Sequence, residues 1–408
     1  MAAAKKKSTK SSGSNKSSNN NLTVIVFVAV LVFGLFYALT GKDVLGIFTP
    51  TETPGTTGAT VAAPVTQPGV PPVSNTSSDW WQVYFTDPLN VNNPDNWQNS
   101  IEGHLIDKIN AAQKSIHIAS FEFDLTPVAE ALISAKQRGV DVRWVTDDES
   151  GLAADEEPGR GQFKMLQDAG IEVKDDSRTA LMHNKFWIFD GEWVWTGSTN
   201  VTVSGIFDQN NNTIVIRSTK LAEMYEREFQ EMWDGKFGPR SPSTVDQQSL
   251  TLNGTPIQVY FSPEDDVLNH IIPVVESAKT NIRFLAFSFT DYPLAKAMID
   301  RAVAGADVAG VFEKTGSETQ SAELRTLYCA KVPVRQDGNP SFLHHKLIVI
   351  DNHIVITGSL NFSTNADTSN DENVIVIDNP DIAKLYMQEF ERDWAQGTDP
   401  DPAKIICD

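Results

Sequence analysis

A polar motif occurs twice in this chain with the same internal spacing, and this repeat limits the folds that the chain can adopt. The segment His183–Asp190 reads HNKFWIFD and recurs as His344–Asp351, which reads HHKLIVID. A Gly-Ser-x-Asn signature follows each copy at the same distance, at 197–200 and at 358–361. Six residues therefore match in type and place. Such agreement indicates two copies of one structural unit rather than two unrelated buried strands.

The matched residues are those needed to stabilise and attack a phosphodiester. Lysine and asparagine side chains can neutralise the charge of a five-coordinate phosphorus transition state. An oriented neutral imidazole can be the nucleophile, and a protonated imidazole can donate to the leaving oxygen. The candidate catalytic residues are His183, Lys185, Asn200, His344, Lys346 and Asn361, and the candidate supporting residues include Ser198 and Ser359.

Each motif is predicted to be a β-hairpin with His and Lys at its start and Gly-Ser-x-Asn at its end. Apolar runs at 186–189 and 347–350 predict buried strands, and 192–196 and 353–357 predict the returning strands. The turns between them begin at Asp190 and Asp351, so these two aspartates are assigned to turn structure rather than to catalysis.

The motifs resemble those of the phospholipase D superfamily, which is defined by His-x-Lys-x4-Asp. The resemblance extends further, because Gln-Val-Tyr-Phe occurs at 82–85 and again at 258–261. It implies an α/β fold with two pseudo-symmetric lobes, 80–240 and 256–398, each a mixed β-sheet flanked by helices. It also implies an active site at the lobe interface, a covalent phosphohistidine intermediate, and no required metal or other cofactor. Helices are expected at 127–138, 221–233, 293–304 and 382–394.

One difference between the repeats bears on the roles of the two histidines. Fourteen residues after the motif glycine stands Asn211 in the first repeat and Glu372 in the second. In similar proteins a polar group at this place bonds the far ring nitrogen of the catalytic histidine. Because a carboxylate favours the imidazolium, pairing within each repeat predicts His183 as the nucleophile and His344 as the general acid.

The first fifth of the chain has a different character. Residues 22–40 are nineteen uncharged, mostly apolar residues, about the length of a membrane-spanning helix, and they follow a basic tail at 1–21. Positive flanks favour an uncleaved signal anchor that leaves the later chain outside the cytoplasm, with a cleaved signal peptide as the alternative. Residues 41–79 are rich in Thr and Pro and predict an extended stalk.

Charge and cysteine content narrow the remaining choices. The chain carries −20, and residues 1–78 contribute six lysines and two acidic residues, so the rest carries −24. This weighs against broad electrostatic binding to nucleic acid. An acidic stretch at 147–157 is interpreted as a solvated loop, with a cation site or a substrate gate as alternatives. Residues 241–255 are expected to be a linker and 399–408 a tail, and Cys329 and Cys407 are free to pair or not.

The sequence predicts a phosphodiester hydrolase of the phospholipase D type that acts outside the cytoplasm. Phospholipid is the favoured substrate because of the predicted membrane helix and the acidic exterior. A nuclease acting on DNA or RNA is the alternative. A catalytically inactive binding protein is disfavoured because both motifs are intact. Protein partners are unknown from the sequence.

Overall fold

The computed structural model describes residues 78–407 of the 408-residue chain. The predicted basic tail, the predicted membrane helix at 22–40 and nearly all of the predicted stalk lie outside these residues. Between residues 78 and 407, no helix is both long enough and apolar enough to cross a bilayer.

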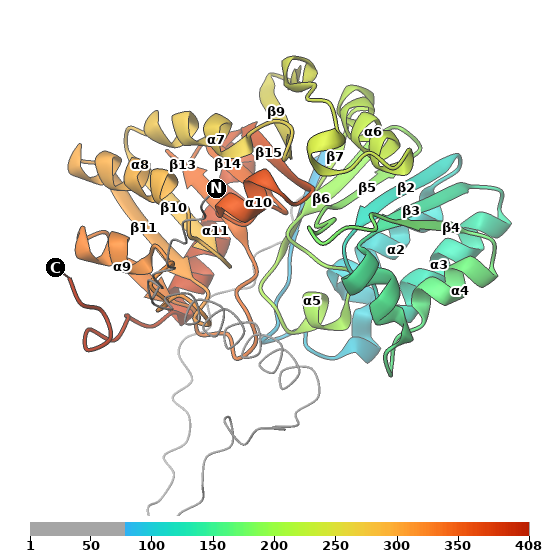
Figure 1. Ribbon diagram of the computed structural model, residues 1–408, viewed down its shortest axis with the longest axis horizontal. Coiled ribbons are helices and arrows are strands. Elements are labelled where there is room, and N and C mark those ends of the chain that lie inside the picture. Colours follow the sequence, from blue (N-terminus) through green and yellow to red (C-terminus); the bar gives the residue numbers. More distant parts are fainter. Residues whose placement is uncertain (1–77, 408) are drawn as a thin grey trace, which may run out of the picture. The chain divides into compact units, whose positions relative to one another are not determined.

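The first repeat is built on a seven-stranded mixed sheet, to the right in Figure 1. The strand order is β1-β7-β6-β5-β2-β3-β4, with β2, β3 and β4 parallel and the other neighbours antiparallel. The strands are β1 (Trp81–Phe85), β2 (Ser115–Ser120), β3 (Asp141–Thr146), β4 (Glu172–Asp175), β5 (Lys185–Phe189), β6 (Trp193–Gly197) and β7 (Asn212–Arg217).

The second repeat contains an eight-stranded sheet of order β12-β11-β10-β13-β14-β15-β9-β8, which repeats the first arrangement and adds one edge strand. The prediction of two α/β units with mixed sheets is confirmed. The strands are β8 (Ser249–Leu252), β9 (Thr255–Ser262), β10 (Asn281–Ala286), β11 (Asp307–Phe312), β12 (Val334–Gln336), β13 (Lys346–Ile350), β14 (Ile354–Gly358) and β15 (Glu372–Asp378).

The added strand corrects the predicted linker at 241–255, because β8 lies within it. A two-residue turn joins β8 to β9, and its residues Asn253 and Gly254 have φ angles of 50° and 82°. Asn-Gly suits tight hairpin turns because both residues adopt positive φ at little cost. The sequence therefore held the signal for this hairpin, and the linker prediction overlooked it.

Helices cover the outer faces of the two sheets, as Figure 1 shows. On the outer side of the first sheet lie α2 (Ile101–Ala111), α3 (Thr126–Gln137) and α4 (Gln162–Asp168), and on the outer side of the second lie α7 (Val267–Glu276), α8 (Tyr292–Val303) and α9 (Leu324–Cys329). The last helix of each repeat, α6 (Thr219–Trp233) or α11 (Pro380–Gln396), contributes to one core shared by both sheets. The four predicted helices correspond to α3, α6, α8 and α11.

The sequences of α6 and α11 explain their inward position. In α6, Leu221, Tyr225 and Phe229 are buried at a spacing of four residues, which places them on one face of a helix. In α11, Ile382, Tyr386 and Phe390 repeat this pattern. Side chains cap both N-termini, Ser218 for α6 and Asn379 for α11.

Two short parallel bridges join the repeats at the start of the motifs. The backbone N–H of His183 donates to Asp371 O at 2.9 Å, and that of His344 donates to Asn210 O at 2.9 Å. The start of each motif hairpin therefore lies beside the start of the last strand of the other repeat. This crossing decides which side chains meet at the site.

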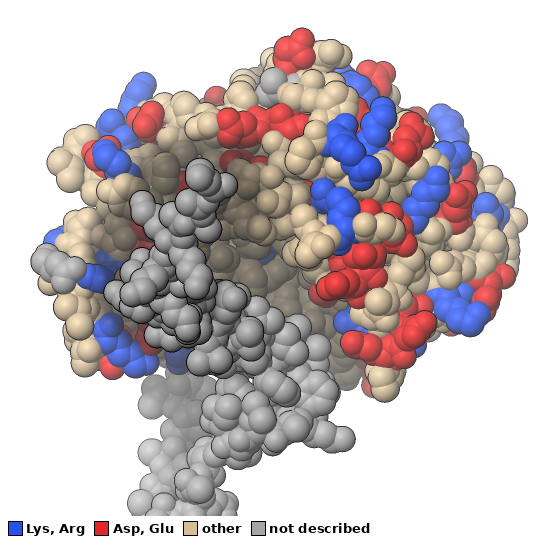
Figure 2. Space-filling view, in the orientation of Figure 1, with Lys and Arg blue, Asp and Glu red and all other residues tan. Residues whose placement is uncertain are grey.

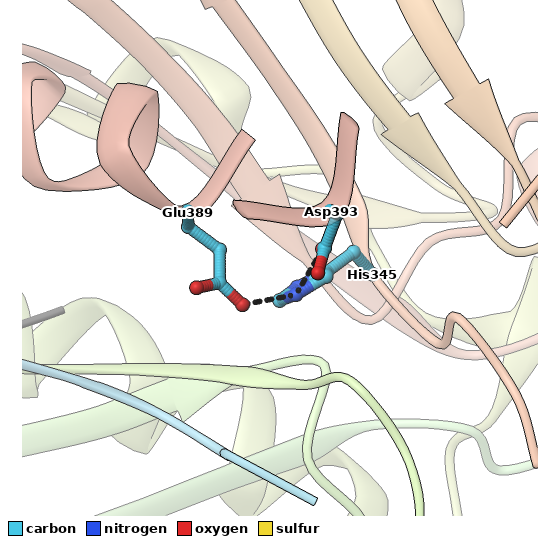
Figure 3. A group of neighbouring side chains, drawn as sticks. All are labelled: His345, Glu389 and Asp393. Atoms are coloured by element: carbon cyan, nitrogen blue, oxygen red, sulfur yellow. Dashed lines mark hydrogen bonds and ion pairs between the residues drawn. The ribbon is translucent and has the colours of Figure 1, made fainter. Parts of the chain in front are cut away.

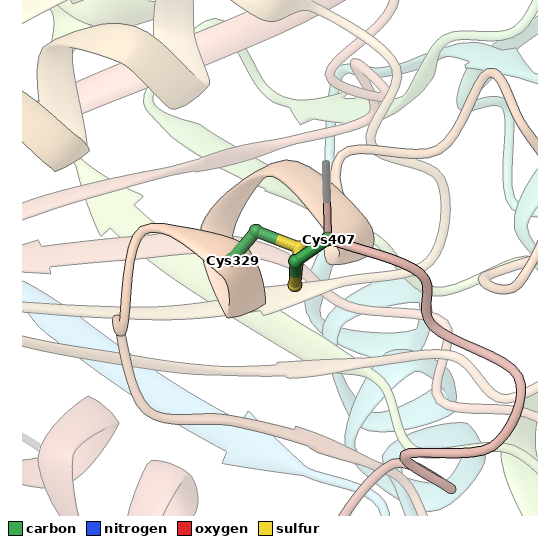
Figure 4. Close-up of a disulfide and its surroundings, with 2 residues drawn as sticks. All are labelled: Cys329 and Cys407. Carbon is green, nitrogen blue, oxygen red and sulfur yellow. A yellow bond between two sulfur atoms is a disulfide. The ribbon is translucent and has the colours of Figure 1, made fainter.

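A disulfide between Cys329, at the end of α9, and Cys407 fastens the C-terminal tail to the second repeat (Figure 4). The side chain of Ile405 is buried in the outer core of that repeat, and Lys404 Nζ lies 2.9 Å from Glu318 Oε2. The tail at 399–407 is thus part of the folded unit.

Replacing both cysteines with serine is expected to lower the free energy of unfolding by about 2–4 kcal/mol, because the bond closes a long loop in the unfolded chain. Chemical denaturation of wild type, with and without reductant, and of C329S/C407S measures the effect. Reduced wild type and the double variant should unfold together. Equal stability of oxidised wild type and the double variant would contradict this expectation.

Candidate active site

The first motif histidine is buried at the lobe interface and bonds a carboxylate of the second repeat. His183 is 6 % exposed, and its Nδ1 lies 2.7 Å from Glu372 Oε2. Because the ionised carboxylate only accepts, Nδ1 carries the proton, and among the described residues none bonds Nε2. The ring is thereby oriented with Nε2 available for chemistry.

The second motif histidine is held by the first repeat through an amide. His344 is 6 % exposed, and its Nδ1 lies 2.9 Å from Asn211 Oδ1 and 3.1 Å from Ser198 O. The amide nitrogen of Asn211 donates to Gly205 O at 2.9 Å, which assigns the amide oxygen to the histidine. Ser198 Oγ donates to the same Asn211 oxygen at 2.8 Å.

The pairing expected from the sequence was wrong in this respect. Asn211 was expected to bond His183, and Glu372 to bond His344, within each repeat. The structure crosses these partners because each motif begins against the other repeat's last strand. Spacing along the chain identified the correct residues but could not reveal which histidine each would reach.

The motif lysines lie beside the histidines and are almost fully buried. Lys185 Nζ donates to His183 O at 2.9 Å, and Lys346 Nζ donates to His344 O at 2.8 Å. Phenylalanine rings lie against both groups: Phe121 is 4.8 Å from the His183 ring, and Phe287 is 4.7 Å from the His344 ring. Each phenylalanine ring meets its imidazole edge to face, at interplanar angles of 67° and 65°.

The Gly-Ser-x-Asn signature ends in an asparagine in each repeat. The Oδ1 atoms of Asn200 and Asn361 are buried and have no hydrogen-bond partner among the described residues. Gly197 and Gly358 have φ angles of 149° and 152°, and a Cβ would lie within 2.2 Å of the backbone oxygen of Asn212 or Asn373. Glycine is required here because the signature crosses the last strand at close range. In the second copy, Ser359 Oγ accepts from the backbone N–H of Asn373 at 2.9 Å.

Burial and mutual repulsion suppress positive charge in the site. Burial lowers the pKa of His183 to about 4 against the opposing effect of Glu372, and lowers the pKa of Lys185 to about 8. Burial, together with the charge of the neighbouring lysines, keeps the pKa values of His344 and Lys346 well below their ordinary ranges. An anion among these four groups would raise all four pKa values. The site is therefore suited to an anionic group such as a phosphodiester.

The motif aspartates are remote from this chemistry. Asp190 accepts from the backbone N–H groups of 113–115, and Asp351 accepts from those of 279–281 and from the Thr280 hydroxyl. Although desolvation alone would raise it, these bonds hold the pKa of Asp351 below its ordinary value. Both carboxylates fasten the hairpin turn to the loop before β2 or β10.

The acidic stretch after β3 is only partly a solvated loop, which corrects the sequence interpretation. Asp147 is 1 % exposed and accepts from the backbone N–H of Met182, the residue before His183, at 3.2 Å. Asp147, Asp148 and Asp176 place carboxylate oxygens within 4.8 Å of one another, as a cation site would. Arg178 already ion-pairs with Asp176. The hydrogen bond from Met182 to Asp147 therefore helps to hold the start of the motif strand in place.

Several residues that bond the motifs are not predicted from the sequence. Asn212 and Asn373 each contact, across the lobe interface, the residue between the histidine and the lysine of the other repeat's motif. Asn212 Nδ2 lies 2.9 Å from His345 Nδ1, and Asn373 Nδ2 donates to Asn184 Oδ1 at 2.8 Å. The available signal was identity between the repeats outside the motif. Asn212 and Asn373 occupy the same place, as do Phe121 and Phe287.

The geometry defines a class of protein: a two-lobed phosphodiester-processing fold with one histidine and one lysine from each lobe close enough to influence one another. The family model described as "Cardiolipin synthase, PLD-like domain" matches residues 105–233 and 271–394. The matched ranges cover most of both repeats, and the chain belongs to this phospholipase D-like family.

Individual relatives agree with the family assignment. The chain is 32% identical over 139 residues to a phospholipase D of Rickettsia bellii, covering 34% of this chain and 69% of that protein. It is 33% identical over 130 residues to a mitochondrial cardiolipin hydrolase of Xenopus laevis, covering 32% of this chain and 60% of that protein. These relatives and the family model identify the chain as a phosphodiester hydrolase.

A solved structure shares the two-lobed fold. The phosphatidylserine synthase of Haemophilus influenzae aligns over 72% of this chain and 84% of that chain, with a TM-score of 0.57 and 15% identity. At this identity the likeness concerns the fold alone.

Both site histidines are expected to be neutral and protonated at Nδ1 at about pH 6, where a free imidazole is largely charged. Nitrogen-15 NMR of histidine-labelled protein, assigned with H183N and H344N, measures this. Glu372→Gln removes the group that raises the pKa of His183, so the His183 pKa should fall further while that of His344 changes less. An imidazolium at either residue near pH 6 would contradict the burial argument.

Proposed function

We propose that the protein cleaves phosphodiesters in two steps through a covalent intermediate on His183, and that its substrate is a phospholipid outside the cytoplasm. One observation carries the assignment of roles. His183 bonds a carboxylate at 2.7 Å, whereas His344 bonds an amide at 2.9 Å. His183 stays the nucleophile and His344 the general acid, as expected from the sequence. The reason is different: a carboxylate, not an amide, now favours His183 as the nucleophile.

A carboxylate at Nδ1 suits the nucleophile because positive charge develops on the ring as Nε2 bonds to phosphorus. Glu372 accepts a hydrogen bond from Nδ1–H throughout the reaction. It thereby stabilises the cationic phosphohistidine, as the aspartate of a Ser-His-Asp triad stabilises its imidazolium. Burial keeps His183 neutral beforehand, so its Nε2 lone pair is free for attack.

In the first step, His183 Nε2 attacks phosphorus and the bond to the leaving alcohol breaks. The leaving oxygen takes a proton from Nε2 of His344. The bound phosphodiester supplies the negative charge that raises the pKa of His344 and so allows it to carry that proton. Asn211 orients the ring but, being neutral, does not keep it permanently charged.

In the second step, a water molecule attacks the phosphohistidine. His344 Nε2 takes the water proton, the P–N bond breaks, and His183 returns to its neutral form. Lys185 and Lys346 lie beside the histidines and stabilise the non-bridging oxygens, together with the side chains of Asn200 and Asn361. With product still bound, both histidines are again in the states in which the first step began.

Two observations support a lipid substrate over a nucleic acid. Residues 79–408 carry −24, which opposes a polyanion at long range. Acidic and basic side chains are interleaved over the first lobe in Figure 2, without a continuous basic band on that face.

The location follows from the same proposal. Residues 22–40 would anchor the chain in a membrane, with 41–79 as a spacer and the two repeats outside the cytoplasm. The Cys329–Cys407 disulfide supports an oxidising compartment.

The intermediate should accumulate in His344→Asn treated with bis(p-nitrophenyl) phosphate. This leaving group departs without a proton, so His183 still attacks, while loss of the base slows hydrolysis by about 100-fold or more. Intact and peptide mass spectrometry should locate the p-nitrophenyl phosphoryl adduct on His183. His183→Asn should form none, and an adduct on residue 344 of the wild type would contradict the assigned roles.

A paired assay of the full-length chain tests the substrate. Phosphatidylcholine vesicles should release choline, and H183N should lose that activity by about 1,000-fold or more, as expected for loss of a nucleophile. Single- and double-stranded DNA, with EDTA present throughout, form the second arm. EDTA-resistant DNA cleavage that H183N abolishes, without choline release, would make the protein a nuclease and refute the lipid proposal.

A further inference from the structure

A buried polar network ends on the amide that holds His344. We propose that Glu389 of α11 is a positioning residue for the general acid, because it supports Asn211, and through it the His344 ring, along two separate hydrogen-bonded paths. This inference rests on the proposed two-histidine mechanism and adds a residue that does not itself touch the substrate.

The first path runs through the residue between the motif histidine and lysine. Glu389 Oε1 lies 3.0 Å from His345 Nε2 (Figure 3). On the other side of the ring, His345 Nδ1 lies 2.9 Å from Asn212 Nδ2. The backbone N–H of Asn212 donates to Ser198 Oγ at 3.1 Å, and Ser198 Oγ donates to Asn211 Oδ1 at 2.8 Å. That oxygen is the one bonded to His344.

The second path reaches the backbone of Asn211. Glu389 Oε1 also accepts from the guanidinium of Arg392. Arg392 Nη2 donates to Thr86 O at 2.7 Å. The backbone N–H of Asn211 donates to Thr86 Oγ1 at 2.7 Å, and the N–H of Thr86 donates to Asn211 O at 3.1 Å. One carboxylate oxygen therefore supports both the side chain and the main chain of Asn211.

The donors along the first path can be assigned from the repeat itself. The Thr357 hydroxyl donates to Asn212 Oδ1 at 2.9 Å, so the amide nitrogen faces His345. In the other half, Thr196 donates to Asn373 Oδ1 at 2.6 Å, and Asn373 presents its nitrogen to Asn184. His345 thus accepts at Nδ1 and donates from Nε2 to Glu389. Burial, which lowers the pKa of His345 to about 4, agrees with this neutral form.

Three side chains of this network are of types that bind metal ions, but the guanidinium of Arg392 already supplies a positive charge beside them. His345, Glu389 and Asp393 place ligand atoms within 4.8 Å of one another. Arg392 donates to the Glu389 oxygen that faces His345, and Asn210 donates to Asp393 at 2.9 Å. The guanidinium supplies the positive charge there, so the group acts as a support rather than as a metal centre.

The first repeat has the matching carboxylate but not the network. Glu228 occupies the place of Glu389, since Glu-Phe-x3-Trp begins at both positions. The motif residue there is Asn184, whose amide meets Met232 Sδ at 3.8 Å, and Glu228 lies beside Glu264 instead. His183 needs less support because its bond to Glu372 is charge-assisted, whereas the neutral bond from His344 to Asn211 is weaker.

Comparing substrates with different leaving groups shows whether Glu389 positions the general acid or only stabilises the fold. Glu389→Gln and His345→Asn should lower kcat on phosphatidylcholine by about ten-fold or more, since its leaving alcohol needs the proton. With bis(p-nitrophenyl) phosphate, whose leaving group needs none, formation of the adduct should change by less than about two-fold. Glu228→Gln, at the same place in the first repeat, is the matched control and should show no dependence on the leaving group.

An equal fall on both substrates, or no fall on either, would overturn the proposal for Glu389. If the assay above identifies DNA as substrate, a short single-stranded oligonucleotide replaces the lipid, because its leaving alcohol also needs a proton. A wild-type protein that cleaves none of these substrates would refute the proposed function instead. The network is then tested by nitrogen-15 NMR: the His344 Nδ1 signal should shift in E389Q and not in E228Q, and an unchanged signal in E389Q would refute it.

Discussion

The site depends on two hydrogen bonds that cross between the repeats, from His183 to Glu372 and from His344 to Asn211. Neither repeat holds its own histidine, so neither contains a complete site. The crossing is possible because the strand after each Gly-Ser-x-Asn signature starts beside the other repeat's motif. The shared core of α6 and α11 keeps the two sheets in the relation that these bonds require.

Small differences between two similar halves divide the chemistry between them. The strands, turns, lysines and signature residues are alike, whereas the partner of the histidine is a carboxylate in one half and an amide in the other. The middle motif residue also differs, Asn184 against His345, and only the second connects to a helix carboxylate. A single chain can make such changes in one half, while a dimer of identical subunits would carry them in both.

The sequence predicted the repeats, the hairpins and four of the helices because these depend on local periodicity and turn residues. It also identified the two histidines and two lysines that the structure brings together. It failed where the outcome depended on contacts between distant segments: the partners of His183 and His344 were exchanged, and Asp147 was assigned to solvent. The strand at 249–252 was a different failure, since its Asn-Gly turn was visible. The membrane anchor predicted at residues 22–40 stays a prediction, because these residues lie outside the part of the chain that the structure describes.

A crystal structure with bound vanadate would show which histidine attacks phosphorus, because vanadate adopts the five-coordinate geometry of the transition state. We expect a bond from vanadium to His183 Nε2, with the apical oxygen opposite facing His344 and the lysines and asparagines around the equatorial oxygens. The hydrogen bond from His183 to Glu372 should remain. A bond from vanadium to His344, or vanadate bound away from both histidines, would refute His183 as the nucleophile.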